Sequence, residues 1–162
     1  GIPYGMAFHK NSYVGRTFIK PTQEERESSV HLKLSVLESV VKDKRIVLVD
    51  DSIVRGTTIA NLIHMLKEAG AKEVHVRISS PPFLHPCYFG TDVPSNDQLI
   101  AASHSTEEIC KMIGADSLGY MQTDYLEGMA GGLPLCKACF DGNYPMEIPD
   151  YTNAEFADIV KC

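Results

Sequence analysis

A strand–loop–helix–strand pattern between residues 45 and 79 constrains the fold more than any other feature of the chain. Arg45–Val49 is a short aliphatic run bounded by charge, which is typical of a buried parallel strand. Apolar residues then recur with helical spacing at Ile59, Leu62, Ile63 and Leu66. Gly70 suits the left-handed end of that helix, and Val74–Ser79 alternates as a second strand. The pattern predicts a right-handed βαβ crossover in an α/β fold, with a mostly parallel sheet flanked by helices.

The sequence on either side of this unit predicts further elements. We expect a mobile loop at His9–Lys20, a short helix at Gln23–Ser29, and then a strand and a short helix near Leu37. A long proline-rich connection follows Pro81, and TEEICKMIGA predicts a helix at Thr106–Ile113 that the preceding serines can cap. The glycine-rich stretch EGMAGGLPLCKACFDGNYP leads into a tail with little regularity.

Size and charge narrow the classes of function. The chain has 162 residues and 44% hydrophobic content, enough for one ordinary domain with a core. It contains no apolar run near the roughly 20 residues that span a bilayer, and its start lacks the pattern of a signal peptide. The formal charge of -6 argues against a nucleic-acid partner, because phosphate neutralisation needs a basic face. We expect a cytoplasmic protein that binds neither membrane nor nucleic acid.

The loop after the first strand of the unit reads DDSIVRGTT and carries the chemistry. A loop between a strand and the following helix presents backbone amides at the positive end of the helix dipole, where a phosphate can bind. Gly56 lets the backbone approach closely, and Thr57 and Thr58 can add hydroxyl donors and cap the helix. Asp50 and Asp51 can accept hydrogen bonds from vicinal hydroxyls or hold Mg²⁺. Phosphate at one end and hydroxyls at the other predict a ribose 5-phosphate.

A plainer interpretation of the same loop stays open at this point. The acid pair can simply cap a turn, and SIVRGTT can be a tight connection from strand to helix. The loop is neither a Walker A motif, since Gly-Lys-Ser/Thr is missing at the required spacing, nor a GxGxxG dinucleotide turn.

VLVDDSIVRGTT resembles the phosphoribosyl-pyrophosphate signature of type I phosphoribosyltransferases. Its particular residues resemble those of glutamine phosphoribosylpyrophosphate amidotransferases. The similarity continues through KNSYVGRTFIKPTQEER, SSPPFLHPCYFG, EEICKMIGADSLGY and LCKACFDGNYP. The resemblance implies the later part of a type I phosphoribosyltransferase fold at residues 1–130, incomplete at its N-terminal side. Residues 131–162 are then a cysteine-bearing segment and tail that form no independent domain.

The resemblance also implies a glycosyltransferase reaction. In that family, ammonia released from glutamine by a separate glutaminase domain attacks the anomeric carbon of phosphoribosyl pyrophosphate and displaces pyrophosphate. The product, 5-phosphoribosylamine, begins purine biosynthesis. The implied partners are this substrate, the glutaminase domain, purine nucleotides as feedback inhibitors, and further copies of the chain in a homotetramer. We expect the chain alone to be inactive with glutamine, because no segment resembles the glutaminase.

Individual site residues are carried over from the family to matching positions. Asp50 and Asp51 are expected to bind the ribose hydroxyls and Mg²⁺. The 5-phosphate is expected to be enclosed by Ser52, Ile53, Val54, Arg55, Gly56, Thr57 and Thr58. Lys10 and Arg16 are the expected catalytic contacts to the pyrophosphate, although the same segment can be an ordinary surface connection. The chain departs from the family, which usually has a basic residue, at Ser12, His31 and His104.

The five cysteines are odd in number and widely spread, so they are unlike a set of disulfide bonds. They fit better a metal site formed by some of them, with the others taking no part. Cys136 and Cys139 make a CxxC, which serves zinc, redox and iron–sulfur sites alike. In the Bacillus-like branch of the family a [4Fe-4S] cluster has ligands where Cys87, Cys136 and Cys139 stand, and the fourth ligand is expected outside this chain. Zinc or no metal are the alternatives, and a metal role for His85 is less favoured. The remaining cysteines and two histidines are expected to be bystanders: Cys110, Cys162, His64 and His75.

Two rival functions share the loop. One is a regulatory protein that keeps the pocket to sense phosphoribosyl pyrophosphate and that binds nucleic acid. The acidic balance counts against it. The other is a stand-alone base phosphoribosyltransferase, which the long tail with its CxxC disfavours.

Overall fold

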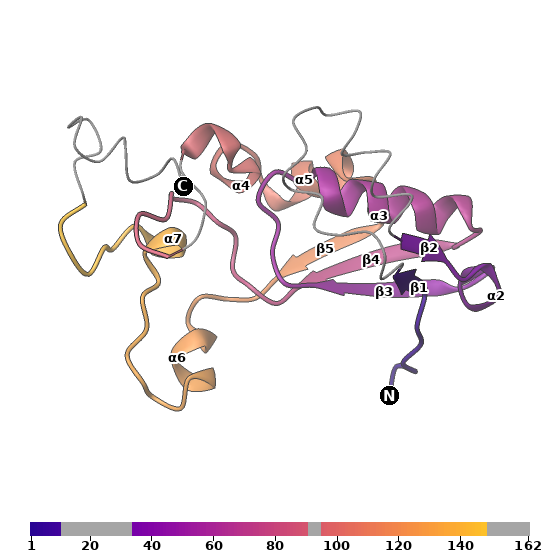
Figure 1. The fold of residues 1–162 in the computed structure, drawn as a ribbon, viewed down its shortest axis with the longest axis horizontal. Coiled ribbons are helices and arrows are strands. Elements are labelled where there is room, and N and C mark those ends of the chain that lie inside the picture. Colours follow the sequence, from indigo (N-terminus) through magenta and orange to yellow (C-terminus); the bar gives the residue numbers. More distant parts are fainter. Residues whose placement is uncertain (11–33, 91–94, 149–162) are drawn as a thin grey trace.

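The computed structural model describes residues 1–10, 34–90 and 95–148, and its strands form two sheets (Figure 1). In the smaller sheet, β1 (Phe8–Lys10) pairs antiparallel with β2 (Leu34–Val36). The larger sheet is entirely parallel, in the order β3 (Arg45–Asp50), β4 (Glu73–Ile78) and β5 (Ser117–Tyr120). The predicted α/β fold with a mostly parallel sheet is confirmed.

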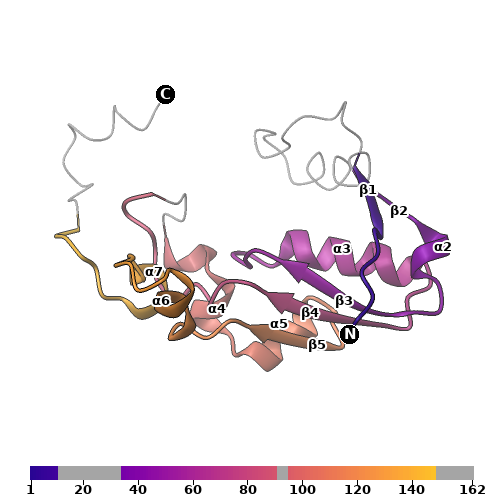
Figure 2. The same ribbon diagram turned by 90° about the horizontal axis from the view of Figure 1, so that it is seen from below.

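The longest helix of the described residues, α3 (Thr57–Glu68), joins β3 to β4 and lies along the larger sheet (Figure 1). The other helices are short: α2 (Glu38–Val41), the 3-10 helix η2 (Asn96–Gln98), α4 (Ile100–Ser103), α5 (Thr106–Met112), α6 (Tyr125–Met129) and α7 (Ala138–Asp141). Figures 1 and 2 show α4, α6 and α7 beyond the carboxyl ends of the parallel strands. That end of the sheet is therefore the one with loops and small helices around it.

One face of the parallel sheet carries the main hydrophobic core. Every second residue of β4 is buried there, namely Val74, Val76 and Ile78. They meet buried side chains of α3 and α5: Ile59, Ile63, Leu66 and Ile109. Each fully buried aliphatic side chain contributes about 1.5–3 kcal/mol relative to an exposed one. Because α3 packs on this face and begins directly after the loop that follows β3, the helical end of that loop is attached to the core.

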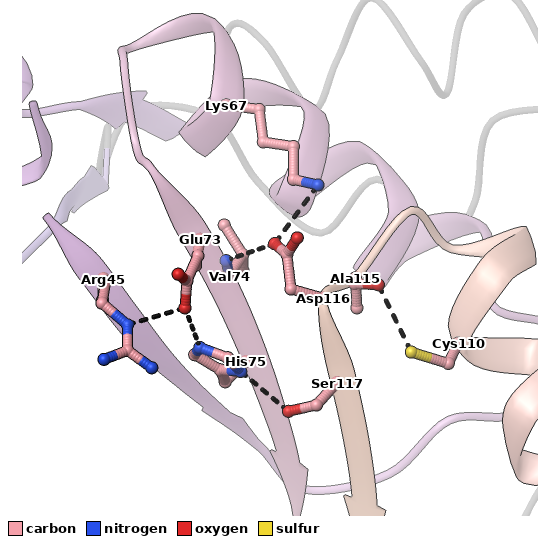
Figure 3. A network of polar contacts seen from close by, with 9 residues as sticks. All are labelled: Arg45, Lys67, Glu73, Val74, His75, Cys110, Ala115, Asp116 and Ser117. Atoms are coloured by element: carbon pink, nitrogen blue, oxygen red, sulfur yellow. Dashed lines mark hydrogen bonds and ion pairs between the residues drawn. The ribbon is translucent and has the colours of Figure 1, made fainter. Parts of the chain in front are cut away.

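The opposite face of the sheet carries polar side chains in a row across the three strands (Figure 3). Arg45 Nε donates to Glu73 Oε2 at 2.6 Å, and His75 Nε2 lies 2.8 Å from the same oxygen. His75 Nδ1 lies 2.8 Å from Ser117 Oγ. The hydrogen bond from Arg45, and then that of His75, lowers the pKa of Glu73. His75 is therefore a hydrogen-bonded strand residue, as predicted.

Helix and turn ends follow the sequence signals closely. Ser105 caps α5 in a capping box, because its hydroxyl accepts from the Glu108 amide and the Glu108 carboxylate accepts from the Ser105 amide. Gly70 adopts φ +89° after α3, the left-handed conformation expected there. A short helix after Leu37 is also present as α2.

One prediction about an irregular segment is wrong within the described residues. His9 and Lys10 belong to β1 and not to a loop, because they pair with Ser35 and Leu34 of β2. The glycine-rich stretch near the C-terminus, for which no element was predicted, contains the short helix α7, which ends at Gly142 with φ +77°. The rest of the His9–Lys20 loop and the Gln23–Ser29 helix lie outside the described residues.

Within residues 1–10, 34–90 and 95–148, no helix combines the length and the apolar composition needed to cross a bilayer.

Candidate functional site

The acid pair lies at the carboxyl end of β3, at the edge of the sheet where ligands bind in open α/β folds. Ser79, just after β4, holds this end in place: its amide donates to Asp50 O at 3.0 Å, and its hydroxyl donates to the same oxygen at 3.3 Å. The strand end is thus tied to its neighbour before the loop begins.

The two carboxylates have different surroundings. Asp50 is half-buried, and its Oδ1 accepts a hydrogen bond from the Asp51 amide at 2.9 Å. Burial raises the pKa of Asp50, the Asp51 charge raises it further, and that amide acts in the opposite direction. Asp51 is exposed, and its Oδ1 accepts from the Ser52 hydroxyl at 3.1 Å. A partly desolvated carboxylate beside an exposed one can attract a cation or sugar hydroxyls, and that role stays a prediction for this pair.

The loop from Ser52 to Gly56 is anchored at both ends. Ile53 is 2% exposed and belongs to the main core. Gly56 occupies the N-cap position of α3 with φ +83°, and a Cβ there would lie 3.1 Å from Ile100 Cδ1. This position requires glycine both for its backbone angle and for the close approach. The predicted importance of Gly56 therefore has a structural reason.

The predicted capping role of Thr57 and Thr58 is wrong, because Gly56 takes the N-cap position and α3 has no side-chain cap in the described structure. Both threonines are exposed in the first turn. Uncapped amides at the start of a 12-residue helix present positive partial charge to solvent. The arrangement can therefore accept an anion, with the two hydroxyls as additional donors.

A segment far along the chain contacts this loop, and sequence reasoning missed it. The Ile100 amide donates to Val54 O at 2.9 Å. Arg55 Nη2 donates to the Gln98 side-chain oxygen, across 43 residues of sequence. No spacing or motif links these positions, so the pattern of the chain gave no signal for them.

The predicted pyrophosphate contacts are described only in part. Lys10 is the last residue of β1, and Arg16 lies outside the described residues. Of the three departures from the family pattern, His104 is the one that the structure describes. It ends α4 as an exposed residue, with Nδ1 2.8 Å from Ser103 Oγ and 3.2 Å from Ile100 O. Its side chain is engaged locally.

Two of the three proposed metal-binding cysteines share a small hydrophobic cluster. Cys87 and Cys139 pack against Phe83 and Leu99, together with Val54 and Phe140. The pKa of the Cys139 thiol rises to about 11, chiefly through burial and further through the charges of Cys87 and Cys136. Cys136 itself is exposed. The Gly90 amide also donates to Cys87 Sγ at 3.4 Å, the kind of bond that stabilises a metal-bound thiolate.

The histidines and the remaining cysteine near or outside this segment each have their own surroundings. Among the described residues, no group of three or more His, Cys, Asp and Glu side chains is placed to hold a metal ion. The ring of His85 packs against Gly142. Cys110 lies elsewhere, and its thiol donates to Ala115 O at 3.3 Å (Figure 3). His64 is exposed, 3.4 Å from Glu68.

The chain is similar to one described family and to named relatives. The family described as "Phosphoribosyl transferase domain" matches residues 6–79. The amidophosphoribosyltransferase of Bacillus subtilis is 52% identical over 157 residues, which cover 91% of this chain and 32% of the relative. The amidophosphoribosyltransferase of Pyrococcus horikoshii is 57% identical over 145 residues, with 90% and 32% covered. The chain thus spans about a third of the length of these relatives.

Solved structures agree with the sequence comparisons. The glutamine phosphoribosylpyrophosphate amidotransferase from B. subtilis, complexed with ADP and GMP, superposes with a TM-score of 0.78 at 51% identity. The match covers 93% of this chain and 34% of that one. A structure described as the allosteric regulatory enzyme of purine biosynthesis matches with a TM-score of 0.76 at 50% identity, over 94% of this chain and 34% of that one.

Proposed function

We propose that the chain forms the phosphoribosyl-pyrophosphate site of an amidophosphoribosyltransferase, because residues 6–79 match the phosphoribosyl transferase domain family and the chain is about 50% identical to amidophosphoribosyltransferases. The enzyme makes 5-phosphoribosylamine at the start of purine biosynthesis. One observation carries the proposal: the acid pair and the uncapped start of α3 are joined by a single short loop, residues 50–58.

The loop offers a place for each part of the substrate. The backbone amides at residues 52–58 and the hydroxyls of Thr57 and Thr58 bind the 5-phosphate at the start of α3. Asp50 and Asp51 accept hydrogen bonds from the two ribose hydroxyls. They would also hold Mg²⁺, directly or through water, because carboxylate oxygens are its preferred protein ligands. When bound, the ion would supply charge neutralisation for the pyrophosphate.

In the reaction, the nitrogen of ammonia forms a bond to the anomeric carbon while the bond from that carbon to the pyrophosphate oxygen breaks. The bonding electrons leave with pyrophosphate, and the new amine loses a proton to solvent or buffer. Positive character develops on the sugar, so the nearby carboxylates stabilise the transition state. Lys10 and Arg16 neutralise the leaving pyrophosphate.

Further parts of the proposal concern what acts with this site. A glutaminase domain supplies the ammonia, so this chain by itself produces no glutamate from glutamine. Purine nucleotides inhibit the enzyme, a proposal supported by the relative that was solved with ADP and GMP. The intact protein is a cytoplasmic homotetramer. The enzyme is favoured over a regulatory protein that only senses the substrate, because the similar proteins are named as amidophosphoribosyltransferases.

We also propose that Cys87, Cys136 and Cys139 bind a metal centre, a [4Fe-4S] cluster with its fourth ligand outside this chain. Zinc is the alternative. Support comes from the shared packing of Cys87 and Cys139 and from the influence of Cys136 on the Cys139 thiol. The CxxC spacing suits either metal.

The function is tested by replacing Asp50→Asn together with Asp51→Asn in the intact protein. We expect kcat/KM for phosphoribosyl pyrophosphate, with ammonia as the nitrogen donor, to fall about 100-fold, because hydrogen bonds to charged groups are lost. The melting temperature should stay the same or rise, since the fold disfavours the negative charge of Asp50. The measurement is pyrophosphate release.

The matched control removes two exposed carboxylates elsewhere, Asp97→Asn with Asp124→Asn. It should leave kcat/KM unchanged, so a general effect of net charge is separated from a local one. Equal kinetics for the Asp50 and Asp51 variant and the wild type would remove the assignment.

A further inference from the structure

The segment Gln98–Ile100 contacts the proposed phosphate loop at three consecutive residues, 54 to 56. Ile100 binds Val54 through the backbone, Gln98 binds Arg55 through side chains, and Ile100 packs against Gly56. We propose that Gln98 is a positioning residue for the 5-phosphate subsite: it holds Arg55, and through it the loop, in the shape that binds phosphate. This inference rests on the proposed function of the loop.

The contacts between this segment and the loop are of two kinds, buried contacts of Leu99 and Ile100 and a side-chain contact of Gln98 near solvent. Leu99 is 1% exposed in the small cluster that also includes Val54, and the Ile100 amide closes on Val54 O. These contacts belong to the core and keep the two segments adjacent. Gln98 lies at the boundary with solvent, and its side chain reaches an exposed arginine. Gln98 can therefore be changed with little loss of packing.

The side-chain contact matters because of what lies on either side of Arg55. Val54 before it is held by Ile100, and Gly56 after it is the left-handed residue from which α3 begins. A loop that binds phosphate through its amides must keep them within about 0.5 Å of their productive positions. Arg55 is the single loop residue between these two held positions. If its long side chain were released, the peptide groups on both sides would gain freedom.

The bond has a definite chemistry. The guanidinium of arginine only donates hydrogen bonds, and the amide oxygen of Gln98 accepts one. Gln98→Ala removes the acceptor. Gln98→Glu keeps an acceptor at this position and adds a charge that pairs with arginine. The two substitutions therefore separate the loss of this bond from the loss of a particular side chain.

The test compares three variants of the intact protein: Gln98→Ala, Gln98→Glu and the neighbouring control Asp97→Ala. With Gln98→Ala we expect KM for phosphoribosyl pyrophosphate to rise roughly fivefold to tenfold, with a smaller change in kcat. Two competitive inhibitors locate the effect. Inhibition by ribose 5-phosphate should weaken by the same factor, whereas inhibition by inorganic pyrophosphate should not change. Gln98→Glu should have a KM for phosphoribosyl pyrophosphate and an inhibition by ribose 5-phosphate close to those of the wild type. Asp97→Ala should match the wild type in both.

Calorimetric titration of the wild type and each variant with ribose 5-phosphate separates a failure of the positioning role from a failure of the proposed function. Binding by the wild type with equal binding by Gln98→Ala overturns the positioning role and leaves the proposed function standing. A weakening of ribose 5-phosphate and pyrophosphate by the same factor also overturns it, because the effect is then not confined to the phosphate loop. A wild type that neither binds ribose 5-phosphate nor releases pyrophosphate overturns the proposed function and this inference with it.

Discussion

Two hydroxyl groups near the carboxyl end of the parallel sheet are buried without a hydrogen-bond partner among the residues that the structure describes, Ser80 Oγ and Tyr120 OH. The ring of Tyr120 packs against the main core. Burial raises the pKa of its hydroxyl to about 12. A buried hydroxyl that makes no hydrogen bond costs about 1–3 kcal/mol of stability. The ring of Tyr120 therefore stabilises this part of the fold, whereas its unpaired hydroxyl lowers the stability.

We expect Tyr120→Phe to raise the free energy of unfolding by about 1 kcal/mol, because it keeps the ring and removes the unpaired group. Urea unfolding at neutral pH measures the change. Tyr125→Phe is the matched control, since Tyr125 is 61% exposed and its hydroxyl is solvated, and it should leave stability unchanged. A loss of stability in Tyr120→Phe would mean that the hydroxyl has a partner that the described residues do not reveal.

At the scale of residues, the sequence predicted that the acid pair ends a strand and that Gly56 precedes a helix, because both features depend on neighbouring residues. Like charges at a strand end and a glycine before a helix are recognisable from their immediate neighbours. Gln98 was missed because its contact joins segments that only the folded chain brings together. The capping role of the threonines failed for a local reason, since a glycine in the left-handed conformation already occupies the N-cap.

At the scale of elements, Asp116 joins three of them at the amino end of the sheet (Figure 3). It precedes β5, accepts from the Val74 amide of β4 at 2.7 Å, and lies 3.3 Å from Lys67 Nζ of α3. The hydrogen bond from Val74 lowers the pKa of Asp116, and Lys67 lowers it further. The folded pKa is thus below the unfolded value of 3.8. The contribution to stability is present above that value and is lost as pH falls through the folded pKa.

Asp116→Asn is therefore expected to lower the free energy of unfolding at pH 7 by about 0.5–1 kcal/mol, a modest amount because the carboxylate is partly screened by solvent. The difference from wild type should shrink at a pH well below 3.8, as the wild-type carboxyl also becomes protonated on passing through its lowered pKa. Urea unfolding at both pH values gives the comparison. Asp124→Asn, which removes an exposed carboxylate elsewhere, is the control. A constant difference for Asp116→Asn at both pH values would contradict the assignment.

Elements with strong periodicity were predicted well, and the strand expected before Leu37 is present as β2, but β1 was not predicted. The strands β3 and β4 and the helices α3 and α5 follow the apolar spacing and the caps of the chain. β1 was mistaken for loop because a three-residue strand shows no period of its own and forms by pairing with β2. The position of a short strand is thus a tertiary property.

At the scale of the whole molecule, the phosphate loop and the cysteine segment share one small hydrophobic cluster. Val54 of the loop, Phe83 and Leu99 pack together with Cys87 and Cys139. The rings of Phe83 and Phe140 lie 5.1 Å apart and continue the contact toward α7. The proposed metal centre therefore sits against the structure that supports the proposed substrate site, and the two can be tested in one set of variants.

We expect the intact protein, purified without oxygen, to contain iron and sulfide, and Cys136→Ser to lose most of both. Cys136 is exposed, so its replacement removes a ligand with little loss of packing. Cys110→Ser is the control, because that thiol donates to Ala115 O away from the cluster and should leave the metal content unchanged. Zinc that replaces iron in the wild type and falls in Cys136→Ser would favour a zinc site. Equal metal content in wild type, Cys136→Ser and Cys110→Ser would exclude Cys136 as a ligand.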